Sequence, residues 1–274
     1  MWDVLPAGKH LGGAPANFAY HAGQQGAEST VVSRIGNDDL GSEIRSVLDS
    51  KGLSSSLQTD MENPTGTVTV EIAGEGIPEY VIHQPVAWDF LDYNSELKEL
   101  ASECDAVCFG SLAQRNEVSG QSIRSFVENT GPKALRIFDI NLRQEFYSKE
   151  LIDQNLHLAN VVKFNDDEYE ILRGMYDLPN DELLFIREMI NRFDLSHLVF
   201  TKGGDGSYFS DRDFTSYLRT PEIEIVDTIG AGDSFTATIV MGILNENPVT
   251  ETHKKAIEVS AFVCSSKGAM PEYN

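Results

Sequence analysis

The chain has 274 residues, 41% of them hydrophobic, and a formal net charge of −22 at pH 7. No apolar run approaches the roughly 18 residues that a membrane-spanning helix needs, so the sequence predicts a globular protein with no membrane role. The acidic balance argues against a nucleic-acid partner, because proteins bind duplexes through a basic face that releases counterions from the phosphates. A helix N-terminus and a few cations can still bind a small phosphate-bearing ligand inside a cleft.

Length and cysteine content indicate one cytoplasmic domain. Because α/β enzymes of this size fold around one continuous sheet, we expect residues 1–274 to form one main domain. The three cysteines, Cys104, Cys108 and Cys264, are an odd number without metal-ligand spacing, and no signal-like apolar segment precedes them. We therefore expect a reducing, cytoplasmic location.

The N-terminal region contains a glycine pair, Gly12 and Gly13, directly before a run of small residues that predicts a helix from Ala14 to Ala22. Taken alone, such a pair is a device for close packing. Asn17 lies within the predicted helix, and its amide offers both a donor and an acceptor, as a polyhydroxyl ligand requires. Asp3, taken alone, is an ordinary solvated carboxylate near a terminus.

Residues 66–84 predict a β-hairpin. The segments 67–72 and 80–82 have a partly alternating apolar pattern and flank a glycine- and proline-containing turn at 74–78. A hairpin placed this early cannot easily join a parallel core, so we expect it to project as a small lid over the cleft. We assign about residues 2–13 and 62–86 to this lid. A homodimer formed through it is one arrangement that such a lid permits.

From residue 105 onward, short apolar runs alternate with amphipathic stretches. The apolar runs lie at 106–109, 135–138, 161–164 and 198–201, and the first amphipathic stretches lie at 117–129 and 149–158. This rhythm predicts βα units and an α/β fold with a mostly parallel central sheet flanked by helices. In such folds the carboxyl ends of the strands build the site.

Three polar segments directly follow these predicted strands. Arg143 has a guanidinium fork that suits phosphate oxygens, with a surface ion pair as the ordinary alternative. The segment from Asn165 to Glu168 contains three consecutive acids. They favour either a charged helix start or the organisation of Mg²⁺, an ion that keeps several waters and needs few carboxylate oxygens. The segment from Thr201 to Gly206, taken alone, is a glycine-rich turn between strands.

The segment 225–235, IVDTIGAGDSF, predicts a strand, a glycine turn and a helix that runs to about Leu244. Gly230 and Gly232 allow backbone N–H groups to approach a ligand, and the helix adds its positive end, so the turn predicts an anion-binding hole. Asp233 then lies in the first helical turn. It is either a cap for free N–H groups or a base that accepts a hydroxyl proton beside the hole.

The run DTIGAGDSF, which starts at Asp227, resembles the second signature of the ribokinase-type (PfkB) carbohydrate kinases almost residue for residue. The resemblance implies a ribokinase-like fold and an ATP-dependent sugar kinase. It implies that Asp233 is the catalytic base and that the amides of Gly230, Ala231 and Gly232 form the anion hole. It also implies that Asp227 helps to hold a monovalent cation, which we expect to be K⁺.

The resemblance extends to the sugar side of the family's site. Gly12, Gly13 and Asn17 resemble the first family signature, whose residues contact sugar hydroxyls. Asp3 matches an aspartate that binds sugar hydroxyls in fructokinase-like members. Arg143 matches an arginine that the family places on the phosphates or the sugar.

The nucleotide side is matched as well. Asn165 and Glu168 resemble the family's Asn-x-x-Glu element, which approaches the nucleotide phosphates and organises Mg²⁺ through water. The residues that match the nucleotide loop of the family are Thr201, Lys202, Gly203 and Gly206. No G-x-x-x-x-G-K-[ST] loop, no G-x-G-x-x-G after a strand and no histidine pair at metal spacing occurs, which disfavours a P-loop kinase, an NAD enzyme and a zinc enzyme.

Segments 84–89 and 110–115 are similar to bacterial fructokinases in particular. The implied reaction is transfer of the γ-phosphoryl group of ATP to the 6-hydroxyl of fructose, with Mg²⁺ and a closing lid. Within the enzyme class, 2-keto-3-deoxygluconate kinase, whose branch also carries an Asp-x-Asn-x-Arg segment, and nucleoside kinase are the alternatives. A catalytically silent sugar-binding homologue is disfavoured, because Asp233, Gly230 and Gly232 are all present.

The position of Asp3 bears on the chain ends. Only Met1 and Trp2 precede it, and chain ends usually fray, whereas a sugar-binding carboxylate must be held rigidly. The family has a buried strand before its Trp-Asp segment and continues past the part that matches residues 268–271. We therefore expect the full-length protein to extend by on the order of ten residues upstream and a few tens downstream.

Overall fold

The computed structural model describes residues 1–5, 8–72 and 78–273. Its largest sheet has six strands in the order β12-β11-β10-β9-β8-β7. Their bounds are β7 Ala106–Gly110, β8 Leu135–Asp139, β9 Val161–Asn165, β10 His197–Thr201, β11 Ser207–Asp211 and β12 Thr215–Leu218. Strands β7 to β10 run parallel, and β11 and β12 are antiparallel additions at one edge. The predicted α/β fold with a mostly parallel central sheet is confirmed.

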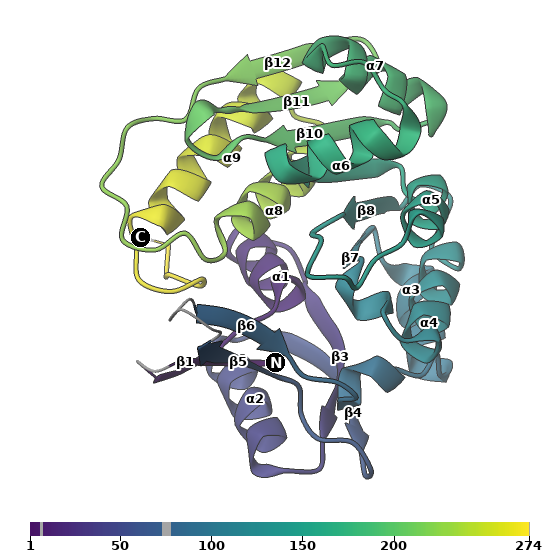
Figure 1. Cartoon of the computed structure of the whole chain (residues 1–274), viewed down its shortest axis with the longest axis vertical. Coiled ribbons are helices and arrows are strands. Elements are labelled where there is room, and N and C mark those ends of the chain that lie inside the picture. Colours follow the sequence, from purple (N-terminus) through teal and green to yellow (C-terminus); the bar gives the residue numbers. More distant parts are fainter. Residues whose placement is uncertain (6–7, 73–77, 274) are drawn as a thin grey trace.

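Helices cover both faces of this sheet (Figure 1). The helix bounds are α1 Ala14–Gln24, α2 Asp39–Ser50, α3 Ser95–Glu103, α4 Glu117–Glu128, α5 Lys149–Leu158, α6 Asp166–Tyr176, α7 Glu182–Arg192, α8 Ala231–Leu244 and α9 Val249–Cys264. Phe164 packs in the cluster of residues from α4 to α7, whereas Val161 of the same strand packs against Val240 of α8. Because both faces of the sheet are buried, the sequences of these strands are continuous apolar runs rather than alternating apolar and polar residues.

The helices begin in two different ways. Helices α4, α5 and α7 start at Asn116, Ser148 and Asp181, whose side chains accept a backbone N–H of the first turn. Helices α1 and α8 instead start at Gly13 and Gly230, with no side-chain cap. Their first turns therefore offer backbone N–H groups that no side chain occupies.

A second sheet has the strand order β2-β1-β5-β6 and lies apart from the central sheet (Figure 1). Its strands are β1 Trp2–Leu5, β2 Gly8–Leu11, β5 Thr67–Ile72 and β6 Pro78–Ile82. The antiparallel pair β5–β6 confirms the predicted hairpin strands, and most of the expected turn, residues 74–77, lies outside the described residues. Asp3 is held between neighbours on both sides, His10 of β2 and Val68 of β5. That this sheet acts as a lid stays a prediction.

The remaining sheet is a parallel pair, β3 (Thr30–Gly36) and β4 (Ser54–Asp60), joined by α2. The described residues also contain the short single-turn helices η2 Ala87–Phe90, η3 Leu112–Gln114 and η4 Gly203–Asp205. Within residues 1–5, 8–72 and 78–273, no helix has the length and apolar character needed to cross a membrane.

One sequence prediction is wrong, because no strand precedes the glycine turn at 230–232. Ile225 and Val226 are 66% and 50% exposed, and they lie in an irregular segment. The backbone N–H groups of Val226 and Asp227 both donate to one carbonyl, that of Cys264 at the end of α9 (2.9 and 3.2 Å). β-Branched residues favoured a strand, but the segment has a helix end rather than a strand as its partner.

Candidate active site

The two glycine motifs at opposite ends of the chain meet in space. Asn17 of α1 donates a hydrogen bond from Nδ2 to Oδ2 of Asp233 on α8 over 2.7 Å, across a separation of 216 residues. Asn17 is buried, and its Oδ1 has no partner among the described residues. This amide oxygen is an acceptor that a ligand hydroxyl could satisfy.

The turn before α8 requires glycine at its first position. Gly230 has φ of +81°, and a Cβ added there would lie 2.8 Å from both the Cβ and the carbonyl oxygen of Ala269. The carboxylate of Asp233 contacts Asn17 rather than a backbone N–H of this turn, among the hydrogen bonds of the described residues. Asp233 therefore does not cap α8. The N–H of Ala231 is engaged by a long bond of 3.3 Å to the carbonyl of Thr228.

The environment of Asp233 makes it a stronger base than an ordinary aspartate. Burial raises its pKa to about 6, and the charge of Asp139 acts in the same direction. The hydrogen bond from Asn17 and the charges of Lys163 and Arg143 oppose this rise. A base with a pKa near the working pH is suited to accept a proton from a hydroxyl.

A buried ion pair lies beside Asp233. Lys163 of β9 donates from Nζ to Oδ1 of Asp139 at the end of β8 over 3.0 Å, and the two residues are partners in the parallel register. A Cβ added at Gly232 would lie 3.5 Å from this Nζ, so the ammonium is next to the first turn of α8. In the sequence, Lys163 belongs to the predicted apolar strand 161–164. The feature of the sequence that could have revealed its role was a charged residue inside an apolar run predicted to be a buried strand.

Glu168 forms a capping box at the start of α6. Its Oε2 accepts the N–H of Asn165 and its Oε1 accepts the N–H of Leu142, both over 2.8 Å, while Asn165 Oδ1 accepts the N–H of Glu168 over 2.9 Å. Burial raises the pKa of Glu168, although Lys163 opposes the rise. The predicted helix start is therefore present, and it also fixes the loop that carries Arg143.

The loop after β8 has a constrained backbone. Asn141 and Gln144, on either side of Arg143, have φ of 42° and 49°, a region that residues other than glycine seldom adopt. Gln144 donates to the carbonyl of Tyr80 in β6 over 2.5 Å. Arg143 is exposed, and it takes part in none of the ion pairs formed by the described residues. The alternative of a surface ion pair is not seen for it.

The predicted sugar-side residues are next to each other. A Cβ at Gly12 would collide with the carboxylate of Asp3, so only glycine leaves room for that carboxylate. Burial raises the pKa of Asp3, whereas the N-terminal amine and His10 lower it. Gly13, with φ of +126°, then starts the helix that carries Asn17. The Asp3 carboxylate and the glycine pair thus both lie at the N-terminal end of α1.

The predicted nucleotide and cation segments lie at neighbouring positions. Thr201 ends β10, next to Asn165 at the end of β9. Lys202 follows Thr201, and its Nζ pairs with Glu182 over 2.7 Å. Of the loop glycines, Gly203 has φ of +51°, and Gly206 has φ of +134° with the carbonyl of Leu218 filling the space that its Cβ would need.

Asp227 joins the glycine turn to the C-terminal loop. Its Oδ1 accepts the N–H of Ile229 over 3.0 Å, and its Oδ2 accepts the N–H of Gly268 over 3.2 Å. Within the described ranges no group of three or more His, Cys, Asp or Glu side chains forms a ready-made metal site. A cation beside Asp227 or Glu168 would therefore need backbone carbonyls, water or a bound ligand for most of its coordination.

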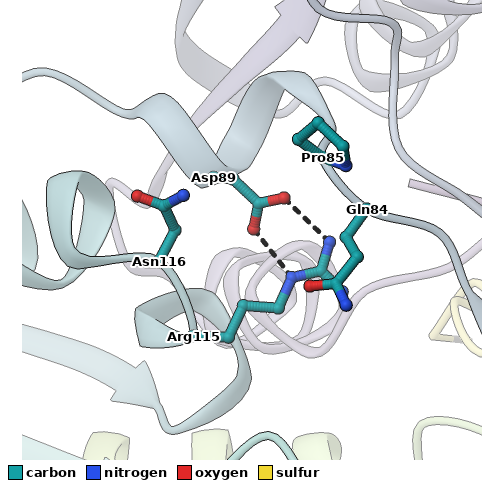
Figure 2. A pocket seen from close by; sticks show the side chains of 5 residues that line it. All are labelled: Gln84, Pro85, Asp89, Arg115 and Asn116. Atoms are coloured by element: carbon teal, nitrogen blue, oxygen red, sulfur yellow. Dashed lines mark hydrogen bonds and ion pairs between the residues drawn. The ribbon is translucent and has the colours of Figure 1, made fainter.

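A separate pocket of about 150 Å³ lies where the second sheet joins the body, and Figure 2 shows its lining. Arg115 binds both carboxylate oxygens of Asp89 over 2.8 and 2.9 Å, and also donates to the carbonyl of His83 over 2.6 Å. Its guanidinium stacks 4.1 Å from the ring centroid of Trp88. The two fructokinase-like segments thus meet in one buried ion pair. None of the predicted catalytic residues lines this pocket.

Comparison with known proteins assigns the family. The model of the pfkB family of carbohydrate kinases matches residues 7–273. This chain belongs to that family. The prediction of a carbohydrate kinase is thereby confirmed.

Individual relatives are distant. The fructokinase of Escherichia coli is 26% identical over 287 residues, covering 98% of this chain and 92% of that protein. The uncharacterized sugar kinase PH1459 of Pyrococcus horikoshii is 26% identical over 249 residues, covering 88% of this chain and 76% of that protein.

Solved structures confirm the ribokinase-like sugar kinase fold. PH1459 superposes with a TM-score of 0.85 at 23% identity, covering 98% of this chain and 91% of that one. A fructokinase of Xylella fastidiosa with bound ATP also has a TM-score of 0.85, at 18% identity and with the same coverage. A fructokinase of Vibrio cholerae bound to fructose, ADP and calcium has a TM-score of 0.79 at 24% identity, with 98% and 91% coverage. At these identities the likeness concerns the fold.

Proposed function

We propose that this carbohydrate kinase is an ATP-dependent fructokinase, which transfers the γ-phosphoryl group of ATP to the 6-hydroxyl of fructose. The observation that carries the proposal is the hydrogen bond between Asn17 and Asp233, because it brings the sugar signature of the family to the side chain that matches its base. Fructokinases among the relatives and neighbours support the choice of sugar.

In the proposed reaction Asp233 accepts the proton of the sugar hydroxyl as the hydroxyl oxygen bonds to the γ-phosphorus. The bond between that phosphorus and the bridging oxygen breaks, and ADP leaves with the electron pair. A pKa of about 6 keeps Asp233 mostly ionised at neutral pH while preserving its basicity. The amides of Gly230, Ala231 and Gly232, together with the positive end of α8, stabilise the charge on the equatorial phosphoryl oxygens.

The sugar is proposed to bind between Asp3, Gly12, Gly13 and Asn17. The Asp3 carboxylate accepts hydrogen bonds from hydroxyls, and the free Oδ1 of Asn17 accepts one more. The open space beside Gly13, where no side chain stands, lets the sugar approach the backbone. The second sheet would close over this site, and the contact of Gln144 with Tyr80 would tie that closure to the position of Arg143.

The nucleotide is proposed to lie along Asn165 and the loop of Thr201, Lys202, Gly203 and Gly206, with Arg143 on its phosphates or on the sugar. Mg²⁺, when bound, would neutralise phosphate charge. Each carboxylate oxygen of Glu168 accepts one backbone N–H and keeps a further lone pair, which can accept a hydrogen bond from a metal-bound water.

A monovalent cation is proposed to bind near Asp227. Both of its oxygens already hold backbone N–H groups of the turn and of the C-terminal loop, so a cation there would order the two segments together. K⁺ is our expected ion.

A sugar panel tests the proposal. Purified protein with Mg·ATP is offered fructose, glucose, ribose, 2-keto-3-deoxygluconate and a nucleoside, and ADP formation is measured. We expect the highest kcat/KM for fructose. A clear preference for 2-keto-3-deoxygluconate or a nucleoside would overturn the fructose assignment alone. ADP formation that no added sugar or nucleoside increases would overturn the kinase proposal, and would favour a silent homologue.

A further inference from the structure

Lys163 is a buried cation in the middle of β9, beside Asp139 at the carboxyl end of β8. Its side chain is 8% exposed and that of its partner Asp139 is 9% exposed. An ammonium group in such surroundings is costly unless an opposite charge accompanies it. A leucine or valine would extend the apolar run of β9 without this cost, so the lysine calls for a reason beyond packing.

The charges around Lys163 do not balance. Asp139 of β8, Glu168 of α6 and Asp233 of α8 all act on its ammonium, and Arg143 on the loop after β8 is the other cation that acts on Asp233. Fully ionised, these five groups carry a net negative charge. From the other packed elements, α1 contributes the neutral amide of Asn17 and β7 contributes Cys108, a thiol whose pKa is raised well above its usual value by burial.

The position of the ammonium bears on the phosphoryl group. A side chain at Gly232 would reach van der Waals distance of Lys163 Nζ, at 3.5 Å. The ammonium therefore lies beside the N-terminal turn of α8, where the negative charge of a transferred phosphoryl group would develop. A fixed cation at such a place stabilises that charge without rearrangement during the reaction.

We infer that Lys163, held in place by Asp139, is a positioning residue that keeps the Asp233 carboxylate ionised and adds positive charge beneath the Gly230–Gly232 amides. The inference rests on the proposed kinase function. Lys163 neither gives nor takes a proton in this role. The hydroxyl proton goes to Asp233, and the ammonium acts only by its field.

Two single variants test the inference through opposite shifts in a pH profile. Lys163→Met removes the opposite charge near Asp233, so the acid limb of kcat/KM should move up by about one pH unit. Asp139→Asn removes a like charge, so the limb should move down by a similar amount of about one unit. A purely structural ion pair would move neither limb.

Because Lys163→Met leaves Asp139 buried without a partner, that protein could fail to fold, and a double variant keeps the inference testable. Lys163→Met/Asp139→Asn removes both charges together. Its acid limb should return close to that of the wild type, while kcat falls by about 10- to 100-fold, because the field beneath the amides is lost. The control is Asp89→Asn/Arg115→Met, which removes a buried ion pair elsewhere and should leave the acid limb where it is.

The outcomes separate this inference from the proposed function. An active wild type whose double variant keeps its kcat within about twofold, with only a lower melting temperature, would overturn the role of Lys163 alone. A folded Asp139→Asn protein with an unshifted acid limb would do the same. A wild type without sugar-dependent ADP formation would overturn the kinase proposal and this inference with it.

Discussion

Among the described residues, two ion pairs have both partners buried, and they are built in different ways. At the pocket lined by Gln84, Pro85, Asp89, Arg115 and Asn116, which we call the hinge pocket, Asp89 and Arg115 form the hinge pair. Arg115 binds both oxygens of Asp89, its Nη2 also donates to a backbone carbonyl, and its guanidinium lies over the Trp88 ring. Beside the first turn of α8, Lys163 contacts Asp139 through one hydrogen bond of 3.0 Å, and the charges of Glu168 and Asp233 also act on its ammonium.

The difference distinguishes a structural ion pair from one that lies in the candidate active site. The hinge pair is neutral as a unit and uses the bidentate geometry that makes arginine suited to carboxylates, so it joins η2 to the segment after η3 and fixes the second sheet on the body. The Lys163 pair is also neutral by itself, but Glu168 and Asp233 lie close to it. Burial raises the pKa of Asp233, and the charges of Asp139 and Lys163 shift that pKa in opposite directions. Buried charges that shift the pKa of a neighbouring acid are typical of functional sites rather than of purely structural regions.

Asp233→Asn should give the largest effect on activity and no loss of stability. Without a proton acceptor, kcat should fall by about 10²–10⁴-fold or more. The folded protein binds the Asp233 proton more tightly than the unfolded chain, so the stability this gives is lost as the pH rises through about 6. At neutral pH the buried, ionised carboxylate of Asp233 therefore destabilises the folded protein. Its replacement by the neutral amide of asparagine should raise the free energy of unfolding by roughly 1–3 kcal/mol.

Steady-state rates and thermal unfolding check this prediction together. A folded Asp233→Asn protein with near wild-type turnover would show that the carboxylate has only a structural role. A clear loss of stability at neutral pH would contradict the pKa argument instead.

Arg115→Met should give the largest effect on stability. It leaves Asp89 buried without a counter-charge, which costs about 3–5 kcal/mol of the free energy of unfolding. Denaturant unfolding measures this loss. The matched double variant with Asp89→Asn should recover much of it, because no unpaired charge then remains. If the single and double variants unfold alike, the hinge pair is not a coupled unit.

The acid limb of the wild-type pH profile should report the base. Asp233 must be ionised to accept the proton, so kcat/KM should be level above about pH 6 and fall about tenfold for each pH unit below it. The profile is measured with saturating Mg·ATP and limiting fructose. A limb near the pKa of an ordinary aspartate would contradict the raised value.

Replacing K⁺ should give the smallest effect of the series. A cation at Asp227 would order the turn that contains Gly230, so turnover should be higher in K⁺ than in a bulky organic cation at equal ionic strength. Asp227→Asn should reduce that difference. Equal rates in both salts with the wild type would argue against a cation site.

The sequence predicted the parts of the site that local chemistry encodes. The glycine turn, Asp233 and Asn17 could be found because a helix start without a side-chain cap leaves a readable pattern of small residues. Their meeting in space followed from the family resemblance, since nothing local relates residues 216 positions apart. Strands β7 to β10 of the central sheet were predictable because both faces of the sheet are buried there.

Other features needed the fold. Lys163 was hidden inside an apolar run, because a pattern shows that a strand is buried but not which side chain faces a carboxylate on the next strand. Residues 225–226 have strand-like composition, yet their backbone partner is the end of α9. Asp89 and Arg115 lie in the fructokinase-like segments 84–89 and 110–115, but their contact depends on how the second sheet meets the body.

The most direct test of the central claim is the ³¹P NMR spectrum of a reaction containing the wild-type protein, Mg·ATP and fructose, run beside Asp233→Asn. We predict that the γ-phosphate signal disappears with the wild type and that a phosphomonoester signal replaces it, split into a triplet by the two protons of a primary carbon. Asp233→Asn should show neither change on the same timescale. Release of inorganic phosphate alone, or an equal rate of ester formation by the variant, would contradict a sugar kinase that uses Asp233 as its base.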